Sequence, residues 1–143
     1  MLTDNPALPG ATDATVFLIG SAYYTVTPCR VVDTRNPDGP LAGPALVAQA
    51  DRAFTISGNC GIPVTAKAVS INIAVVGGTV AGHLRLHPGG TAVPVISAIN
   101  FAALQIRANN AISLLNASGQ LGVFNGQATG TVHVIVDVNG YFQ

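Results

Sequence analysis

The sequence predicts an all-β protein: a single β-sandwich, jelly-roll-like and mostly antiparallel, with an extended N-terminal strand. Glu is absent and Lys occurs once, so good helix formers are scarce, whereas β-branched residues are abundant. The 16 glycines and 9 prolines divide the 143-residue chain into short segments. Several of these segments alternate apolar and polar residues, with turns spaced as in a sandwich. Together these observations favour strands throughout.

Residues 1–20 are expected to be an N-terminal leader that carries a candidate donor strand, and residues 21–143 to be the β-sandwich domain. The first 13 residues are interrupted by proline and show no periodicity. The following segment is apolar on both faces of an extended strand, which therefore needs cover on two sides. Its residues are Ala14, Thr15, Val16, Phe17, Leu18 and Ile19.

The remaining segments are predicted in chain order. Extended segments at 22–27 and 29–35 precede a turn-rich loop through residue 44. Further strands are expected at 52–57, 66–76, 82–88, 93–101, 106–115, 120–124 and 131–142. The strictest alternation predicts one buried row facing another. The first row is Val132, Val134, Val136 and Val138, and the second is Val69, Ile71, Ile73 and Val75.

The two cysteines, Cys29 and Cys60, belong to no CxxC motif and have no histidine cluster nearby. A single structural disulfide in an oxidising compartment is favoured, and a pair of buried free thiols is the alternative.

The composition excludes several classes of function. Charged residues make up 8% of the chain against about 25% in a typical soluble domain. The net charge is zero and no basic run occurs, which argues against nucleic acid or an anionic membrane as a partner. No apolar run reaches the roughly 18 residues that a membrane span needs. The first 13 residues contain no basic side chain, unlike a secretory signal, so any signal would have been removed or lie outside this numbering.

No catalytic motif is present and the six Asp residues are dispersed, so we predict neither enzymatic activity nor a cofactor. His83 and His87 lie about 13 Å apart along a strand, too far to chelate one metal ion. Arg35 inside the oxygen-rich segment 33–39 argues for an ion pair there and against a calcium loop. Asn116 begins an Asn-x-Ser sequon and is the candidate glycosylation site, with an unmodified turn as the alternative.

Several motifs carry a family resemblance. They are Pro28 to Arg35 (PCRVVDTR), Gly58 with Cys60 to Pro63, Ala68 to Asn72, Asn100-Phe101, Ala108 to Asn110 and His133 to Phe142 (HVIVDVNGYF). From Tyr24 onward the chain resembles a β-sandwich domain that recurs in exported proteins of environmental bacteria. The resemblance implies secretion, a sandwich fold and pairing of Cys29 with Cys60, and it implies no activity.

The leader, the doubly apolar strand and the sandwich together resemble subunits of bacterial pili and fibrils that assemble by donor-strand exchange. We therefore expect a structural subunit of an extracellular, cell-surface fibre whose partners are other copies of itself. The alternative for the strand is a hairpin that folds back onto Tyr23 to Thr27 of the same chain.

The alternative function is a secreted carbohydrate-binding or adhesive module that contacts surface glycans. The absence of Trp, the usual sugar-stacking residue, disfavours it. Its candidate residues are Tyr23, Tyr24, Tyr141, His83, Arg85 and His87.

Overall fold

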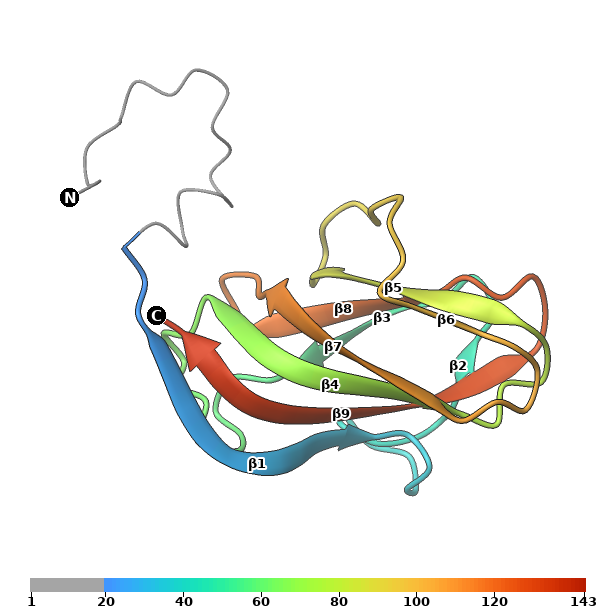
Figure 1. Cartoon of the computed structure of the whole chain (residues 1–143), viewed down its shortest axis with the longest axis horizontal. Coiled ribbons are helices and arrows are strands. Elements are labelled where there is room, and N and C mark those ends of the chain that lie inside the picture. Colours follow the sequence, from blue (N-terminus) through green and yellow to red (C-terminus); the bar gives the residue numbers. More distant parts are fainter. Residues whose placement is uncertain (1–19) are drawn as a thin grey trace, which may run out of the picture.

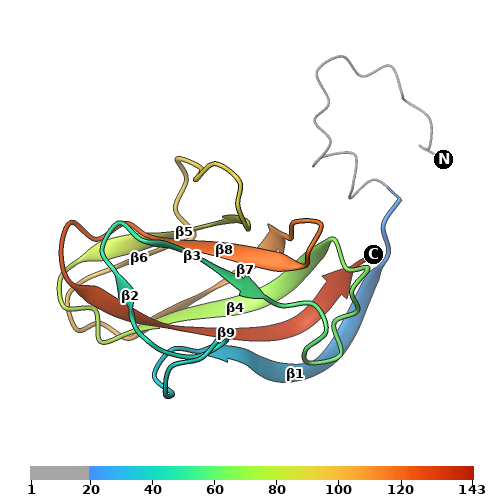
Figure 2. The ribbon, with the colours of Figure 1, turned by 180° about the vertical axis from the view of Figure 1, so that it is seen from behind.

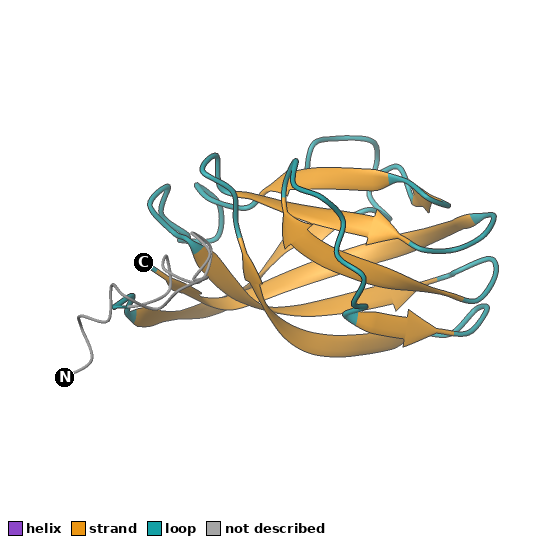
Figure 3. Ribbon diagram, turned by 90° about the horizontal axis from the view of Figure 1, so that it is seen from above, coloured by secondary structure: helices purple, strands orange, loops and turns teal. Residues whose placement is uncertain are grey.

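The structure, a computed structural model, describes residues 20–143, and over this range it consists of strands joined by loops and turns (Figure 3). Nine strands run through it. They are β1 (Tyr23–Asp33), β2 (Leu46–Val47), β3 (Asp51–Thr55), β4 (Ala68–Val76), β5 (Gly82–Pro88), β6 (Ile99–Phe101), β7 (Arg107–Leu114), β8 (Gln120–Asn125) and β9 (Thr131–Phe142). Within the described range, no helix is long and apolar enough to cross a membrane.

The strands form two sheets that pack face to face (Figure 1). The five-stranded sheet has the order β1-β9-β4-β7, with β2 also paired to β9, and the four-stranded sheet has the order β3-β8-β5-β6. The antiparallel pairs β1–β9, β3–β8, β4–β7 and β5–β6 are nested in the sequence like one long hairpin. Successive pairs lie in alternate sheets, which is the jelly-roll arrangement. The predicted jelly-roll-like, antiparallel sandwich is therefore confirmed.

The core contains both of the predicted rows. The eight valine and isoleucine side chains of β4 and β9 that alternation assigned to the interior are fully buried. The predicted geometry of these rows is wrong, however, because β4 and β9 are neighbours in one sheet. Ile73 pairs with Val136 and Val75 pairs with Val134, so the rows lie side by side. Alternation fixes the face on which a side chain lies but not the strand beside it.

The other sheet covers these rows. Its buried side chains join the same apolar cluster and include Phe54, the largest of the fully buried side chains. The others from its strands are Leu84, Ile99, Phe101, Leu121 and Val123.

The strands differ from prediction at several places, and β2 lies in a stretch for which no strand was predicted. Two of the differences are large. The segments expected at 22–27 and 29–35 form the single strand β1, because a register shift between Thr25 and Cys29 accommodates Pro28 in an edge strand. The strand expected at 93–101 is reduced to β6, and the loop before β6 stands away from the sandwich (Figure 1).

We expect Val136→Asp to lower the free energy of unfolding by several kcal/mol, roughly 3 to 5, because it places an unpaired charge in the core. Urea denaturation measures the loss. Val47→Asp is the matched control, because Val47 lies in β2 and is 56% exposed. Equal stability of the two variants would contradict the assigned core.

Candidate functional site

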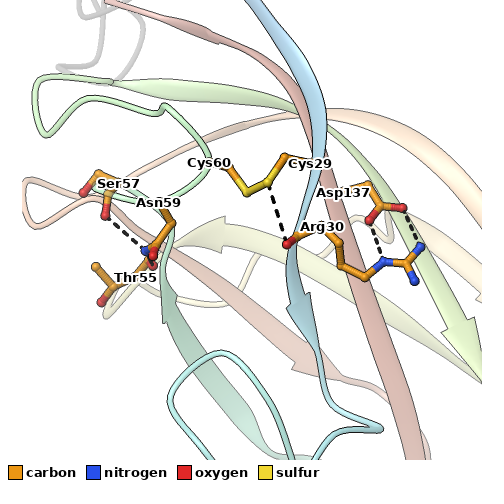
Figure 4. The surroundings of a disulfide bond; sticks show 7 residues. All are labelled: Cys29, Arg30, Thr55, Ser57, Asn59, Cys60 and Asp137. Carbon is orange, nitrogen blue, oxygen red and sulfur yellow. Dashed lines mark hydrogen bonds and ion pairs between the residues drawn. A yellow bond between two sulfur atoms is a disulfide. The ribbon is translucent and has the colours of Figure 1, made fainter.

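The predicted disulfide joins Cys29 on β1 to Cys60 in the connection between β3 and β4 (Figure 4). The two Cα atoms are 5.7 Å apart. Cys60 and Gly61 both have positive φ, 52° and 75°, and this left-handed turn presents the Cys60 side chain to β1. Because β1 and β3 are edge strands of different sheets, the bond links the two sheets along one long edge of the sandwich.

Ion pairs hold β1 and the turn after it. Arg30 donates to the two carboxylate oxygens of Asp137 on β9 at 2.8 and 3.1 Å. Asp33 accepts two bonds from the Arg35 side chain, at 2.7 and 2.9 Å, and one from its backbone N–H. These Arg35 bonds, led by those from the side chain, lower the pKa of Asp33 to about 2. The Pro28–Arg35 motif is thus structural, as the ion-pair interpretation of its aspartate predicted.

The far end of the same long edge is closed by the chain itself. Beyond Asp33, β2 takes the place of β1 beside β9, and the Gln49 N–H then donates to the Asn125 carbonyl of the other sheet at 2.8 Å. Figure 2 shows this segment running from one sheet to the other. Arg52 stacks on Phe54 at 4.6 Å and donates to three backbone carbonyls of the loop before β2. We call this side, between β1 and β3, the closed edge.

The opposite side, between β7 and the β5–β6 pair, is the open edge. β6 pairs only with Gly82–Leu84, so within the described residues Arg85–Pro88 of β5 has no strand partner on that side. β7 likewise pairs on one side only, with β4. A groove of about 320 Å³ lies between the two unpaired stretches. Its lining includes Leu86, Pro88, Ile96, Ile112 and Leu114.

The groove runs along the last three residues of β7, Ile112, Ser113 and Leu114. The β7 residues Asn109, Ala111 and Ser113 pair with the buried Ile73, Ile71 and Val69 and therefore share their inward face. Of these three, Ser113 lines the groove, whereas Ala111 packs against the core and Asn109 donates from Nδ2 to the Ala98 carbonyl at 2.8 Å. The unfilled space therefore lies beside Ser113, toward the Leu114 end of β7.

Exposed apolar side chains gather at the open edge. Of the nine large apolar side chains that are exposed in the described range, five lie on β7 or on the loops before and after β6. These five, the open-edge patch, are Val95, Ile96, Leu104, Ile106 and Ile112. Two of the five, Ile96 and Ile112, line the groove itself. Exposed apolar side chains that share a groove mark an interaction surface more often than singly scattered ones do.

The candidate sugar-binding residues do not form one face. The three tyrosines lie on β1 and β9, where Tyr24 stacks on Tyr141 at 5.2 Å, while both histidines and Arg85 lie on β5 of the other sheet. The His87 ring is buried over Gly122, where an added Cβ would lie 2.5 Å from it. Its Nε2 is 2.8 Å from the Asp51 carboxylate. The tyrosines and the β5 residues therefore engage separate partners, and together they form no shared aromatic surface for a sugar.

The neighbouring histidine of β5 is likewise engaged. Arg85 Nε lies 3.1 Å from His83 Nε2, and burial together with the Arg85 charge lowers the pKa of His83. Among the described residues, no group of three or more His, Cys, Asp or Glu side chains is placed to hold a metal ion.

The Asn116 side chain organises the turn between β7 and β8. Its Nδ2 donates to the Gly89 carbonyl and to Gln120 Oε1, each at 2.9 Å. Its Oδ1 accepts from the backbone N–H groups of Ser118 and Gln120. Nδ2, the atom to which a glycan would be attached, therefore already donates hydrogen bonds within the fold. Glycosylation of Asn116 stays a prediction.

The predicted donor strand, Ala14 to Ile19, lies outside the described residues. The structure adds one candidate site, the open edge. Sequence patterns identify strands that are present, and they did not reveal a groove that lies where a neighbouring strand is absent. The available signal was the presence of Asn109 and Ser113 at positions that share the inward face of segment 106–115 with Ala111.

We expect the intact protein, purified without reductant, to have a mass about 2 Da below that of its reduced form. Replacing both cysteines, Cys29→Ala with Cys60→Ala, should lower the free energy of unfolding by about 3 to 4 kcal/mol, because the cross-link restricts the unfolded chain. Free thiols in the unreduced protein would contradict the bond.

Asp33 should make stability depend on pH in the acid range. Its folded-state pKa of about 2 lies below the ordinary 3.8, so its contribution is complete above pH 3.8 and is lost as the pH falls through about 2. Asp33→Asn should therefore be less stable than the parent at pH 6, and urea denaturation at lower pH should show this difference shrinking. A difference that does not change with pH would contradict the assignment.

Comparisons with known proteins yield structural likeness alone. No protein-family model matches the chain, and no curated protein matches it. Two solved structures of the Tobacco streak virus coat protein are similar to it at 13% sequence identity. The C2 crystal form has a TM-score of 0.42 and the match covers 83% of this chain and 85% of that one; for the coat protein dimer the values are 0.40, 83% and 84%. We draw no functional conclusion from a likeness at this level, and the resemblance to exported bacterial domains stays a prediction.

Proposed function

We propose that this protein is the structural subunit of an extracellular fibre that assembles by donor-strand exchange. The N-terminal segment Ala14 to Ile19 of one copy completes the sandwich of another. The observation that carries the proposal is the contrast between the two long edges. The closed edge is held by a disulfide, Arg52 and β2, while the open edge carries exposed apolar side chains and a groove.

The chemistry of the segment supports this role. Burial of Val16, Phe17, Leu18 and Ile19 contributes about 6 to 10 kcal/mol, at roughly 1.5 to 3 per side chain, before the cost of ordering the segment is subtracted. The segment carries no charge, so the assembly should resist salt. Main-chain hydrogen bonds to an edge strand add affinity that does not depend on sequence.

The closed edge also disfavours the hairpin alternative. A strand folding back onto Tyr23 to Thr27 would need the outer edge of β1. The cross-linked connection lies beside that stretch, since an added Cβ on Gly61 would contact the Val26 side chain at 3.9 Å. The open edge has no such cover in the described part of the chain.

The location outside the cell is part of the proposal. Structural disulfides persist in oxidising compartments, and the Cys29–Cys60 bond is of this kind. A chain in which only 8% of the residues are charged fits a subunit whose neighbours cover much of its surface.

The purified full-length protein should form filaments visible by negative-stain electron microscopy. Phe17→Asp should abolish them, because it places a charge in the middle of the donor segment. Leu8→Asp changes an apolar leader residue outside that segment and should leave the filaments intact. A full-length chain that stays monomeric at high concentration, or filaments of the Phe17→Asp variant, would overturn the proposal.

A further inference from the structure

We infer that the groove of the open edge is the acceptor site, and that the N-terminal strand of a second copy enters it by pairing with β7. The inference rests on the proposed function, which names the donor segment but not the surface that receives it.

The lengths of the free strand edges favour β7. The donor segment has six residues, Ala14 to Ile19. β7 offers eight residues from Arg107 to Leu114, paired on one side only, whereas the unpaired stretch of β5 has four, Arg85–Pro88. An antiparallel edge strand directs the N–H and C=O groups of alternate residues away from its partner, so β7 can hold a whole six-residue strand in register.

The groove also matches a strand that is apolar on both faces. Inward-facing donor side chains would occupy the space between Leu86 and the small, inward-facing Ser113, both of which line the groove. Outward-facing ones would meet Ile112, which alternates with the inward positions of β7 and is 63% exposed. A strand with one polar face would leave one of these two surfaces uncovered.

The charges agree as well. Asp, Glu, Lys and Arg are absent from the ten residues that line the groove, and Ala14 to Ile19 carries no charge. The one titratable side chain of the lining, His87, is buried and is bonded to Asp51 and to the Pro88 carbonyl. No charged side chain of the groove lining or of the donor segment therefore has to be removed from water when the strand enters the groove.

The first test alters the groove in the full-length chain. Ile96→Asp combined with Ile112→Asp places charges on both of its rims, at side chains that are 73% and 63% exposed and so make few contacts within the subunit. Filaments should be lost, with the melting temperature of the subunit unchanged. The matched control is Val47→Asp with Val64→Asp, two comparably exposed valines away from the groove, which should keep the filaments.

The second test mixes two defective subunits. The Phe17→Asp chain keeps an intact groove, and the Ile96→Asp/Ile112→Asp chain keeps an intact donor segment. Each should be a monomer alone, and an equal mixture should give one-to-one heterodimers by native mass spectrometry. Absence of heterodimers would overturn the inference, since the donor segment then does not meet the groove of another copy.

The two proposals fail differently. Filaments of the groove variant, with none from Phe17→Asp, would place the acceptor elsewhere and leave donor-strand exchange standing. Filaments from both variants would remove donor-strand exchange itself.

Hydrogen exchange gives a readout that needs no groove variant. In filaments of the unaltered chain, the amides of Arg107–Leu114 that point away from β4 should exchange at least about tenfold more slowly than in the Phe17→Asp monomer, because these unpaired groups gain partners. Unchanged exchange along β7 would overturn the pairing.

Discussion

The pairing of β9 with β4 is the interaction on which the rest of the fold depends. The nested hairpin pairs of a jelly roll become two sheets only when strands from different pairs also join, here β9 with β4 and β5 with β8. The first junction carries eight fully buried valine and isoleucine side chains and forms the floor of the core. β1 and β2 pair with β9, and β7 pairs with β4. Every other strand of that sheet is therefore positioned by pairing with one of these two central strands.

The two edge strands of the same sheet, β1 and β7, differ in how well their free edges are protected against pairing with another strand. β1 carries devices that natural proteins use against edge-to-edge pairing: Pro28, the charged Arg30 and two irregularities of register. β7 has no proline, no register shift in its pairing with β4, and no charge beyond Arg107 at its first position. An edge left unprotected beside exposed apolar side chains is an aggregation hazard unless a specific partner covers it.

Particular residues explain how far the sequence alone could lead. The alternation in 66–76 and 131–142 identified the buried face of both central strands, because one buried face leaves a period of two. It could not show that these strands are neighbours, since pairing is set by topology. Pro28 suggested a break that a bulge in an edge strand absorbs, and the apolar segment 93–98 suggested a strand where the chain forms a loop. The groove has only one polar β7 residue in its lining, the inward-facing Ser113, and one residue does not predict a groove.

The separation of donor and acceptor determines what kind of assembly donor-strand exchange would build. The donor segment precedes β1, whereas β7 is the outermost strand at the other side of the sheet, so the two surfaces are different parts of one subunit. A contact between unlike surfaces is heterologous and propagates from copy to copy, into a ring if the rotation closes and into a filament if it does not. In the proposed assembly, a subunit waiting for its partner must stay folded with one edge incomplete. The disulfide and the ion pairs of β1 stabilise the side that each subunit completes by itself, which leaves the β7 side free to depend on a neighbour.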